Sequence, residues 1–247
     1  LQCRNINIHY ASLGFAEMFE SGIRIDKQKA NMIMNVYVSA LEHRLEQFRA
    51  AINWPTFNFR SHPQCAAFLF GFLKGNVQVP EGAKCLNAQP VKSTDKMPWT
   101  ETSAAHGQSP SVDIESCRIL AGSGYPEAAE LYKLRILNTV VRNVLCPPDI
   151  NGEEDGSDEK ASGGILQFIC DDGKIHPRYS PLKETRRCSC AAPNLQNIAN
   201  DREKDYAAIL GEDYPGPIKS IFVADPGYVL LEVDYSGAEL LALGLTA

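Results

Sequence analysis

The sequence predicts an α+β protein, because the spacing of its apolar residues changes along the chain. In roughly the first 145 of the 247 residues, apolar side chains recur at steps of three and four, which is typical of amphipathic helices. Farther on, short apolar runs alternate with turn residues, which indicates strands. Helices first and strands later favour an α+β arrangement over alternating βαβ units.

Start and stop residues place the expected helices. A short helix over 13–21 should end at Gly22, and a long one should follow Asp26, which suits an N-cap. A third is expected after Ser61, with Pro63 in its first turn, and two more over 113–120 and 126–145. The apolar stripe of the long helix consists of Met34, Val38, Leu41, Leu45, Phe48 and Ile52.

Two segments lack this periodicity. Residues 76–110 are rich in Pro, Gly, Ser and Thr, and 152–164 form an acidic, Gly- and Ser-rich stretch. We expect both to be exposed and mobile loops. The acidic run between Asp149 and Lys160 accounts for most of the net charge of −6, so the total charge neither favours nor excludes nucleic-acid binding.

Cysteine spacing and hydropathy predict a cytoplasmic protein with no membrane partner. The eight cysteines contain no C-x-x-C pair, so the usual zinc spacing is missing and free thiols are expected. No apolar run is long enough to span a bilayer. The histidines have no metal-ligand spacing, and His176 is expected to pack or form a hydrogen bond.

The expected strands come in two pairs. Strands over 165–170 and 175–179 are joined by a turn at 171–173, and strands over 218–224 and 228–233 by the turn residues Asp225, Pro226 and Gly227. An apolar helix is expected over 238–247. The last strand would deliver Asp234 at its carboxyl end, where a carboxylate can hold a hard cation such as Mg²⁺. The same residue also suits a plain N-cap, and the local sequence alone favours that second role.

The stretch Asp234-Tyr235-Ser236-Gly237-Ala238-Glu239-Leu240 resembles motif A of the family A DNA polymerases, D-Y-S-x-x-E-L. The resemblance implies that Asp234 is catalytic and binds both metal ions, with the Tyr235 backbone beside them. It also implies that Tyr235, Ser236 and Glu239 lie at the incoming nucleotide, where Glu239 excludes a ribose 2′-hydroxyl. Gly237 and Ala238 stand where the family usually has Gln and Ile.

A second match lies about forty residues upstream. The stretch from Thr185 to Ile198 resembles the family string T-G-R-x-S-S-x-x-P-N-L-Q-N-I, with Arg186 in place of the usual glycine. Side chains of these types can donate to minor-groove acceptors that nearly all base pairs share. The implied DNA-binding residues are Thr185, Arg187, Asn194, Gln196 and Asn197. A polar loop whose Asn and Gln side chains bond to their own backbone is the alternative interpretation.

Weaker matches follow in the family's order, at 18–26, 57–64, 131–139, 173–176 and 218–223. Their collinearity implies a helix at the base of the palm over 1–25, a helical thumb over 26–145 with a mobile insertion near 76–110, and the N-terminal half of a palm with antiparallel strands over 146–247. The implied partners are DNA primer-template and deoxynucleoside triphosphates, and the implied cofactor is Mg²⁺ in a two-metal site.

The family pattern also requires a fingers helix and a second catalytic aspartate, and neither motif is found in this sequence. We therefore expect a polymerase fragment that is inactive alone, completed in cis or in trans by a C-terminal half with the fingers and the rest of the palm. Two other hypotheses remain: a non-catalytic DNA-binding subunit, and a small metal-dependent nuclease that uses Asp234.

Overall fold

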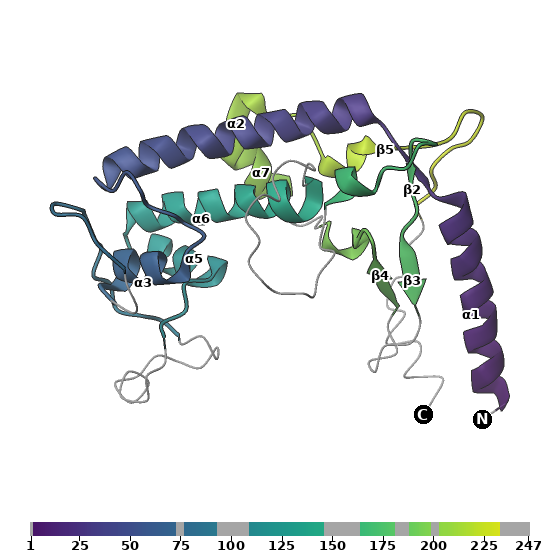
Figure 1. Ribbon diagram of the computed structural model, residues 1–247, viewed down its shortest axis with the longest axis horizontal. Coiled ribbons are helices and arrows are strands. Elements are labelled where there is room, and N and C mark those ends of the chain that lie inside the picture. Colours follow the sequence, from purple (N-terminus) through teal and green to yellow (C-terminus); the bar gives the residue numbers. More distant parts are fainter. Residues whose placement is uncertain are drawn as a thin grey trace.

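A computed structural model describes residues 2–72, 77–92, 109–145, 164–180, 188–198 and 203–232, with side chains from residue 11 onward. It combines helices with two small antiparallel sheets, as an α+β fold requires. Figure 1 shows two long helices lying side by side along the top, a group of helices at one end, and the sheets with the first helix at the other. Among the described residues, every helix is too short or too polar to span a membrane.

The first helix ends, and the next two begin, at the residues that the sequence indicates. Helix α1 (Gln2–Ser21) is longer than expected, and Gly22 ends it with a φ of 61°. Helix α2 (Lys27–Ala51) starts at Asp26, whose side chain accepts from the Lys29 backbone N–H at 2.9 Å. Helix α3 (His62–Phe70) is capped by Ser61 and ends at a left-handed Gly71. The expected N-caps are therefore confirmed.

The helical part has one continuous core. Helix α5 (Ile114–Gly122) and helix α6 (Pro126–Thr139) pack against each other, and α6 also packs along α2. A π-helical turn, η1 (Val140–Leu145), continues α6. The buried side chains of α2 are Ala30, Ile33, Tyr37, Leu41 and Phe48, so Leu41 and Phe48 of the expected stripe lie in the core. Met34, Val38 and Leu45 of that stripe are only partly buried and pack against its edge.

Four aromatic side chains pack together within this core. Phe57 lies 5.5 Å from Phe48, 5.5 Å from Phe68 and 5.3 Å from Trp54 between ring centroids, in tilted or edge-to-face geometry. Residues 77–92 lie in the segment expected to be a loop, and they form no helix. Their backbone hydrogen-bonds to the backbone beside this aromatic cluster. The backbone N–H of Leu86 donates to the Phe68 carbonyl at 2.8 Å, and Ala88 is buried.

The sheets are smaller than the sequence suggests. Strand β1 (Ile23–Ile25) lies between β2 (Lys174–Ile175) and β5 (Phe222–Val223), and both pairings are antiparallel. A second ladder joins β3 (Arg178–Ser180) to β4 (Ser189–Ala191). The expected strand over 175–179 is therefore split, because Pro177 has no N–H with which to continue one ladder.

Two other strand predictions were wrong. Residues 165–168 form the 3₁₀ helix η3 (Ile165–Phe168), with Ile165 buried, because a short apolar run fits a buried helical turn as well as a strand. The run from 218 begins with the 3₁₀ helix η6 (Ile218–Ile221), which leaves only two residues in β5. The expected helix over 238–247 and the stretch 152–163 lie outside the described residues.

The sequence prediction did not include helix α7 (Glu203–Leu210), which is followed by the 3₁₀ helix η5 (Gly211–Asp213). Tyr206 of α7 meets Tyr37 of α2 edge-on at 5.9 Å between ring centroids. Arg44 of α2 donates to the Ile209 carbonyl at 2.5 Å and pairs with Glu130 of α6 at 3.2 Å. This arginine therefore joins three helices.

Replacing Phe57 with Ala should destabilise the protein by about 3–5 kcal/mol, because it empties the centre of the aromatic cluster. The matched control is Met32→Ala on α2, whose side chain is half exposed and should cost less than about 1 kcal/mol. Urea unfolding followed by tryptophan fluorescence measures both. Equal losses in the two variants would contradict the described core.

Candidate nucleic-acid interface

Most of the residues expected at the catalytic and DNA-binding sites lie outside the described part of the chain. Asp234, Tyr235, Ser236 and Glu239 fall in 233–247, and Thr185 and Arg187 fall in 181–187. Asn194 and Gln196 are described, and Asn197 is placed by its backbone at the end of η4 (Leu195–Asn197). The geometry described below is therefore that of the loop around Asn194 and of the segment that leads to Asp234.

The described loop that resembles the DNA-binding string is built by its own polar side chains. Asn194 Oδ1 accepts from the Gln196 backbone N–H at 3.1 Å, which caps η4. Gln196 Nε2 donates to the Cys188 carbonyl at 3.1 Å, which holds the loop against the start of β4. Both side chains are exposed, and each bond uses one end of an amide group that has two polar ends. The loop is thus shaped internally while its amides still face solvent.

The base of this loop is apolar. Cys190 of β4 is buried, and its Sγ donates to the Pro193 carbonyl at 3.3 Å across a cis Ala192–Pro193 bond. Burial, followed by the neighbouring Cys190, raises the pKa of Tyr179 to about 12. Tyr179 also stacks on Phe15 of α1 at 5.8 Å. The β3–β4 ladder and its loop are therefore fixed to the first helix.

The segment that leads to Asp234 leaves the sheet through a tight turn. The Tyr228 N–H donates to the Asp225 carbonyl at 2.9 Å, and Gly227 has a φ of 85°. The turn prediction is confirmed, but residues 228–232 form no strand. Their apolar side chains are largely exposed: Tyr228 77%, Val229 87%, Leu230 62% and Leu231 84%. In the described part of the chain, no strand lies beside this segment to pair with it.

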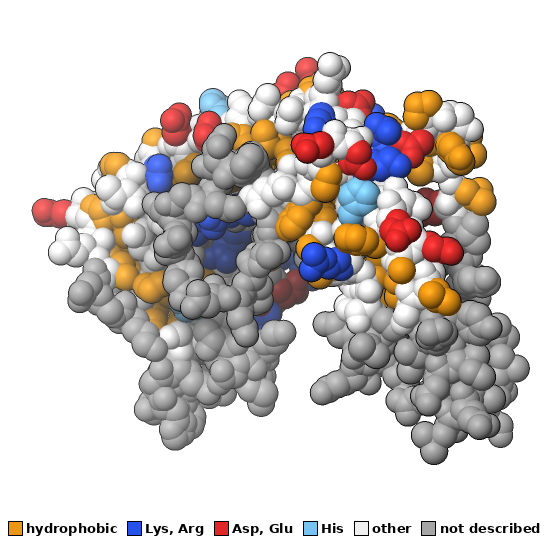
Figure 2. All heavy atoms as spheres, turned by 45° about the vertical axis from the view of Figure 1, so that its right-hand side comes forward, with side chains coloured by type: hydrophobic (Ala, Val, Ile, Leu, Met, Phe, Trp, Pro, Cys, Tyr) orange, Lys and Arg blue, Asp and Glu red, His pale blue; other side chains and the backbone are white. Residues whose placement is uncertain are grey.

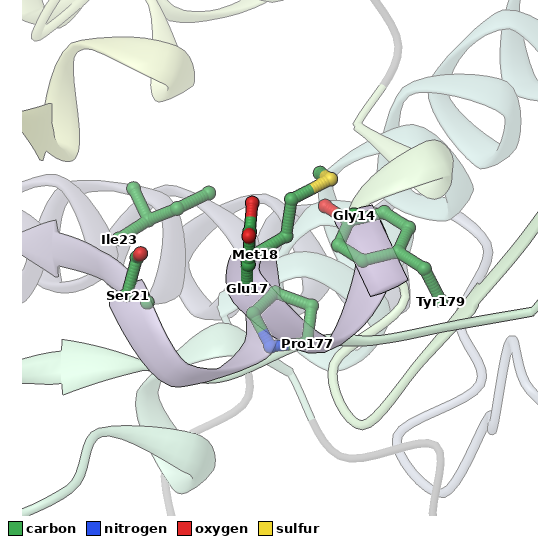
Figure 3. A pocket seen from close by; sticks show the side chains of 8 residues that line it. Gly14, Glu17, Met18, Ser21, Ile23, Pro177 and Tyr179 are labelled. Carbon is green, nitrogen blue, oxygen red and sulfur yellow. The ribbon is translucent and has the colours of Figure 1, made fainter. Parts of the chain in front are cut away.

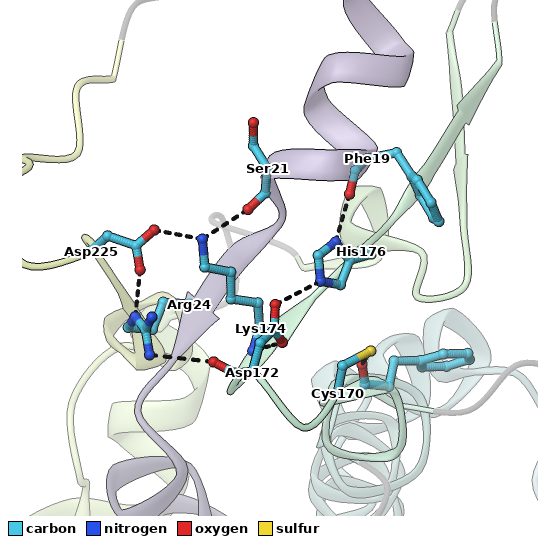
Figure 4. Close-up of polar contacts among 9 residues, drawn as sticks. Phe19, Ser21, Arg24, Cys170, Asp172, Lys174, His176 and Asp225 are labelled. Carbon is cyan, nitrogen blue, oxygen red and sulfur yellow. Dashed lines mark hydrogen bonds and ion pairs between the residues drawn. The ribbon is translucent and has the colours of Figure 1, made fainter.

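Asp225 anchors the root of that segment (Figure 4). Its carboxylate lies 2.5 Å from Arg24 Nε and 2.6 Å from Lys174 Nζ, on the two neighbouring strands β1 and β2. Lys174 also donates to the Ser21 carbonyl at the end of α1. The hydrogen bond from Lys174, and then that from Arg24, holds the pKa of Asp225 below its usual range. One carboxylate therefore joins the chain before Asp234 to both partner strands.

A pocket of about 330 Å³ lies between α1 and the segment before β3 (Figure 3). Glu17 is its only charged lining side chain, and Met18, Pro177 and Tyr179 form much of its apolar wall. A phosphate-bearing ligand requires cations or several N–H donors, which this lining does not offer. Figure 2 shows Lys and Arg side chains elsewhere, inside the hollow beneath the long helices.

Comparisons with known proteins support the resemblance that the motifs indicate. The chain is 34% identical over 123 residues to the DNA polymerase I of Lactococcus lactis subsp. cremoris, and equally to that of L. lactis subsp. lactis. Each match covers 49% of this chain and only 12% of the relative. No protein-family profile matches the chain.

The fold is also similar to that of a solved polymerase domain. The POL domain of Pol1 from M. smegmatis, solved in complex with DNA primer-template and dNTP, matches with a TM-score of 0.57 and 21% identity. The match covers 87% of this chain and 29% of that chain. The resemblance to family A DNA polymerases is therefore confirmed in sequence, and the fold resembles a polymerase domain over most of the chain.

Sequence reasoning missed the residues that organise the base of this region. Arg24, Lys174 and Asp225 lie far apart in the sequence, and only the pairing of β1 with both neighbours brings their charges together. The one sign of their role that the local sequence gives is that Asp225 stands directly before the turn residues Pro226 and Gly227. His176 was expected only to pack or form a hydrogen bond, and the structure gives it both roles.

Replacing Asp225 with Asn should lower stability at neutral pH, because two cations would lose their shared carboxylate. The folded pKa of Asp225 is depressed, so its contribution is fully present above the unfolded value of about 3.9 and is lost as pH falls through the folded pKa. Urea unfolding of wild type and variant at pH 7, and again well below pH 4, should show a gap that closes in acid. Asp213→Asn, at an exposed acid, is the control. A gap that persists unchanged in acid would contradict the ion-pair role.

Proposed function

We propose that this chain is the thumb and the N-terminal half of the palm of a family A DNA polymerase. In this proposal residues 26–145 are the thumb, 146–247 are the palm half, and α1 lies at the palm base. The observation that carries it is the ordered run of family motifs, supported by the identity to DNA polymerase I and by the fold match. The reaction is template-directed nucleotidyl transfer, with primer-template and deoxynucleoside triphosphates as substrates.

Asp234 would supply one carboxylate to a two-metal site for Mg²⁺, which prefers oxygen ligands and keeps substrate phosphates in its coordination shell. The Tyr235 backbone would lie beside the ions, and Ser236 and Glu239 beside the nucleotide. One carboxylate is too few to hold two ions, so the isolated chain should be inactive. The chain spans about 12% of the length of its curated relatives, and a C-terminal half would supply the second carboxylate and the fingers.

The exposed apolar segment 228–231 supports a partner in the palm. Four neighbouring apolar side chains that are largely exposed are an unfavourable surface in water, and a paired strand in a sheet would bury them. A solitary DNA-binding subunit would gain nothing from such a segment. We therefore favour a polymerase half over the DNA-binding subunit and the nuclease.

Primer extension after complementation tests the catalytic role of Asp234. The chain alone should not extend a primer, and adding the C-terminal half in cis or in trans should restore extension. Asp234→Asn keeps the side-chain shape but removes the charge that holds both ions, so the restored activity should vanish. Equal extension by wild type and variant would mean that Asp234 is only a helix cap.

DNA binding should be independent of sequence and should weaken with salt, because phosphate contacts dominate affinity. We expect Arg187→Ala to weaken binding alike for all duplex sequences. Asn194→Ser should do so by about 1 kcal/mol, or roughly fivefold in Kd, because a serine oxygen can still cap η4 while the amide donor is lost. Fluorescence anisotropy with several duplexes measures the effect. Loss restricted to particular base steps would contradict a reading of shared minor-groove acceptors.

A further inference from the structure

Three potential metal ligands meet around the turn before β2, away from Asp234 in the sequence. Cys170 Sγ, a carboxylate oxygen of Asp172 and a ring nitrogen of His176 all lie within 4.8 Å of one another. Figure 4 shows the side chains of Asp172 and His176 directed toward each other, with Cys170 beside the same turn. Thiolate, carboxylate and imidazole together form a ligand set typical of Zn²⁺ rather than of Mg²⁺.

Backbone hydrogen bonds fix the turn that carries two of these ligands. The Cys170 N–H donates to the Lys174 carbonyl at 2.8 Å, and the Gly173 N–H donates to the Cys170 carbonyl at 3.0 Å. Asp172 Oδ1 accepts from the Lys174 N–H at 2.9 Å. That bond holds one carboxylate oxygen of Asp172 in place. Asp172 Oδ2 is left facing His176 at 3.1 Å.

The imidazole of His176 is already oriented for coordination. Its Nδ1 lies 2.6 Å from the Phe19 carbonyl of α1, and a carbonyl only accepts, so Nδ1 carries the proton. Nε2 faces Asp172 Oδ2 at 3.1 Å, and it becomes a ligand atom when a metal ion takes the place of its proton. Metal-binding histidines typically donate their other nitrogen to such an acceptor. Gly22 makes room for the ring, because a Cβ there would lie 2.7 Å from His176 Cε1.

The nearest lysine does not compete for this site. Lys174 Nζ is already engaged elsewhere, 2.9 Å from the Ser21 carbonyl and 2.6 Å from Asp225, as Figure 4 shows. A divalent cation between Nε2 and the carboxylate oxygen would take the place of the contact that joins them at 3.1 Å. The adjoining Asp171 adds a further negative charge to the turn.

We propose that Cys170, Asp172 and His176 bind a borderline-soft divalent metal ion, with Zn²⁺ as the natural occupant and water in the fourth position. Zinc–ligand distances of about 2.0–2.3 Å place tetrahedral ligand atoms roughly 3.3–3.8 Å apart, within reach of small side-chain rotations. On binding, the Cys170 thiol loses its proton to solvent and becomes a thiolate. Through His176 and Phe19, the ion would tie the turn to the end of α1.

Cobalt(II) is the probe, because a cobalt–thiolate bond gives a charge-transfer band in the near ultraviolet. The full 247-residue chain, purified without metal, should develop this band on titration with Co²⁺, and Zn²⁺ should remove it by displacement. Cys170→Ser should abolish the band, and the exposed Cys188→Ser should leave it unchanged. Asp172→Asn keeps the acceptor for Lys174 and should weaken Co²⁺ binding at least about tenfold.

Thermal unfolding gives a second measurement that does not depend on colour. Zn²⁺ should raise the unfolding temperature of the wild type but not that of Cys170→Ser, because an ion that binds only the folded state stabilises it. The exposed Cys170 makes this variant safe for folding, whereas His176 packs against α1. No band in the wild type, or equal bands in wild type and Cys170→Ser, would overturn the proposal.

Discussion

The three-residue strand β1 is the constraint on which the arrangement of the chain depends. It pairs with β2 on one side and β5 on the other, so it joins the start of the chain to two segments from its second half. The charges follow this pairing, because Arg24 on β1 and Lys174 on β2 both bond to Asp225, just beyond β5. The position of α1, the turn at 170–174 and the exit toward Asp234 are all set by this one strand.

The helical half could be predicted because its determinants are local. Asp26, Ser61 and Asp113 each cap the helix that follows by accepting a backbone N–H three residues ahead, and such spacing is visible in the sequence. The strands could not be placed equally well, because their length is set by partners far away. Ile165 lies in an apolar run that fits a strand, and only the packing beside η1 decides for a helical turn.

The same distinction applies to the candidate sites. The Asn194 cap and the Asp225 turn involve neighbours in sequence, and a motif string identified the first segment while turn residues identified the second. The cluster of Cys170, Asp172 and His176 has no recognised zinc spacing, and its key orienting contact comes from Phe19, 157 positions away. No spacing rule could include that carbonyl. The structure is needed wherever a side chain's role depends on which backbone group happens to lie opposite it.

The order in which β1 and its partners are synthesised has a consequence for the growing chain. β1 is made about 200 residues before its partner β5, which at roughly 5–20 residues per second is a delay of about 10–40 s. Until β2 follows, about 150 residues after β1, β1 has neither neighbour, while α2 can already pack against α6. The nascent chain must therefore carry α1 and β1, with apolar Ile23 and Ile25, beside a helical part that forms first. Chaperone binding to the nascent chain would be most useful at this early strand.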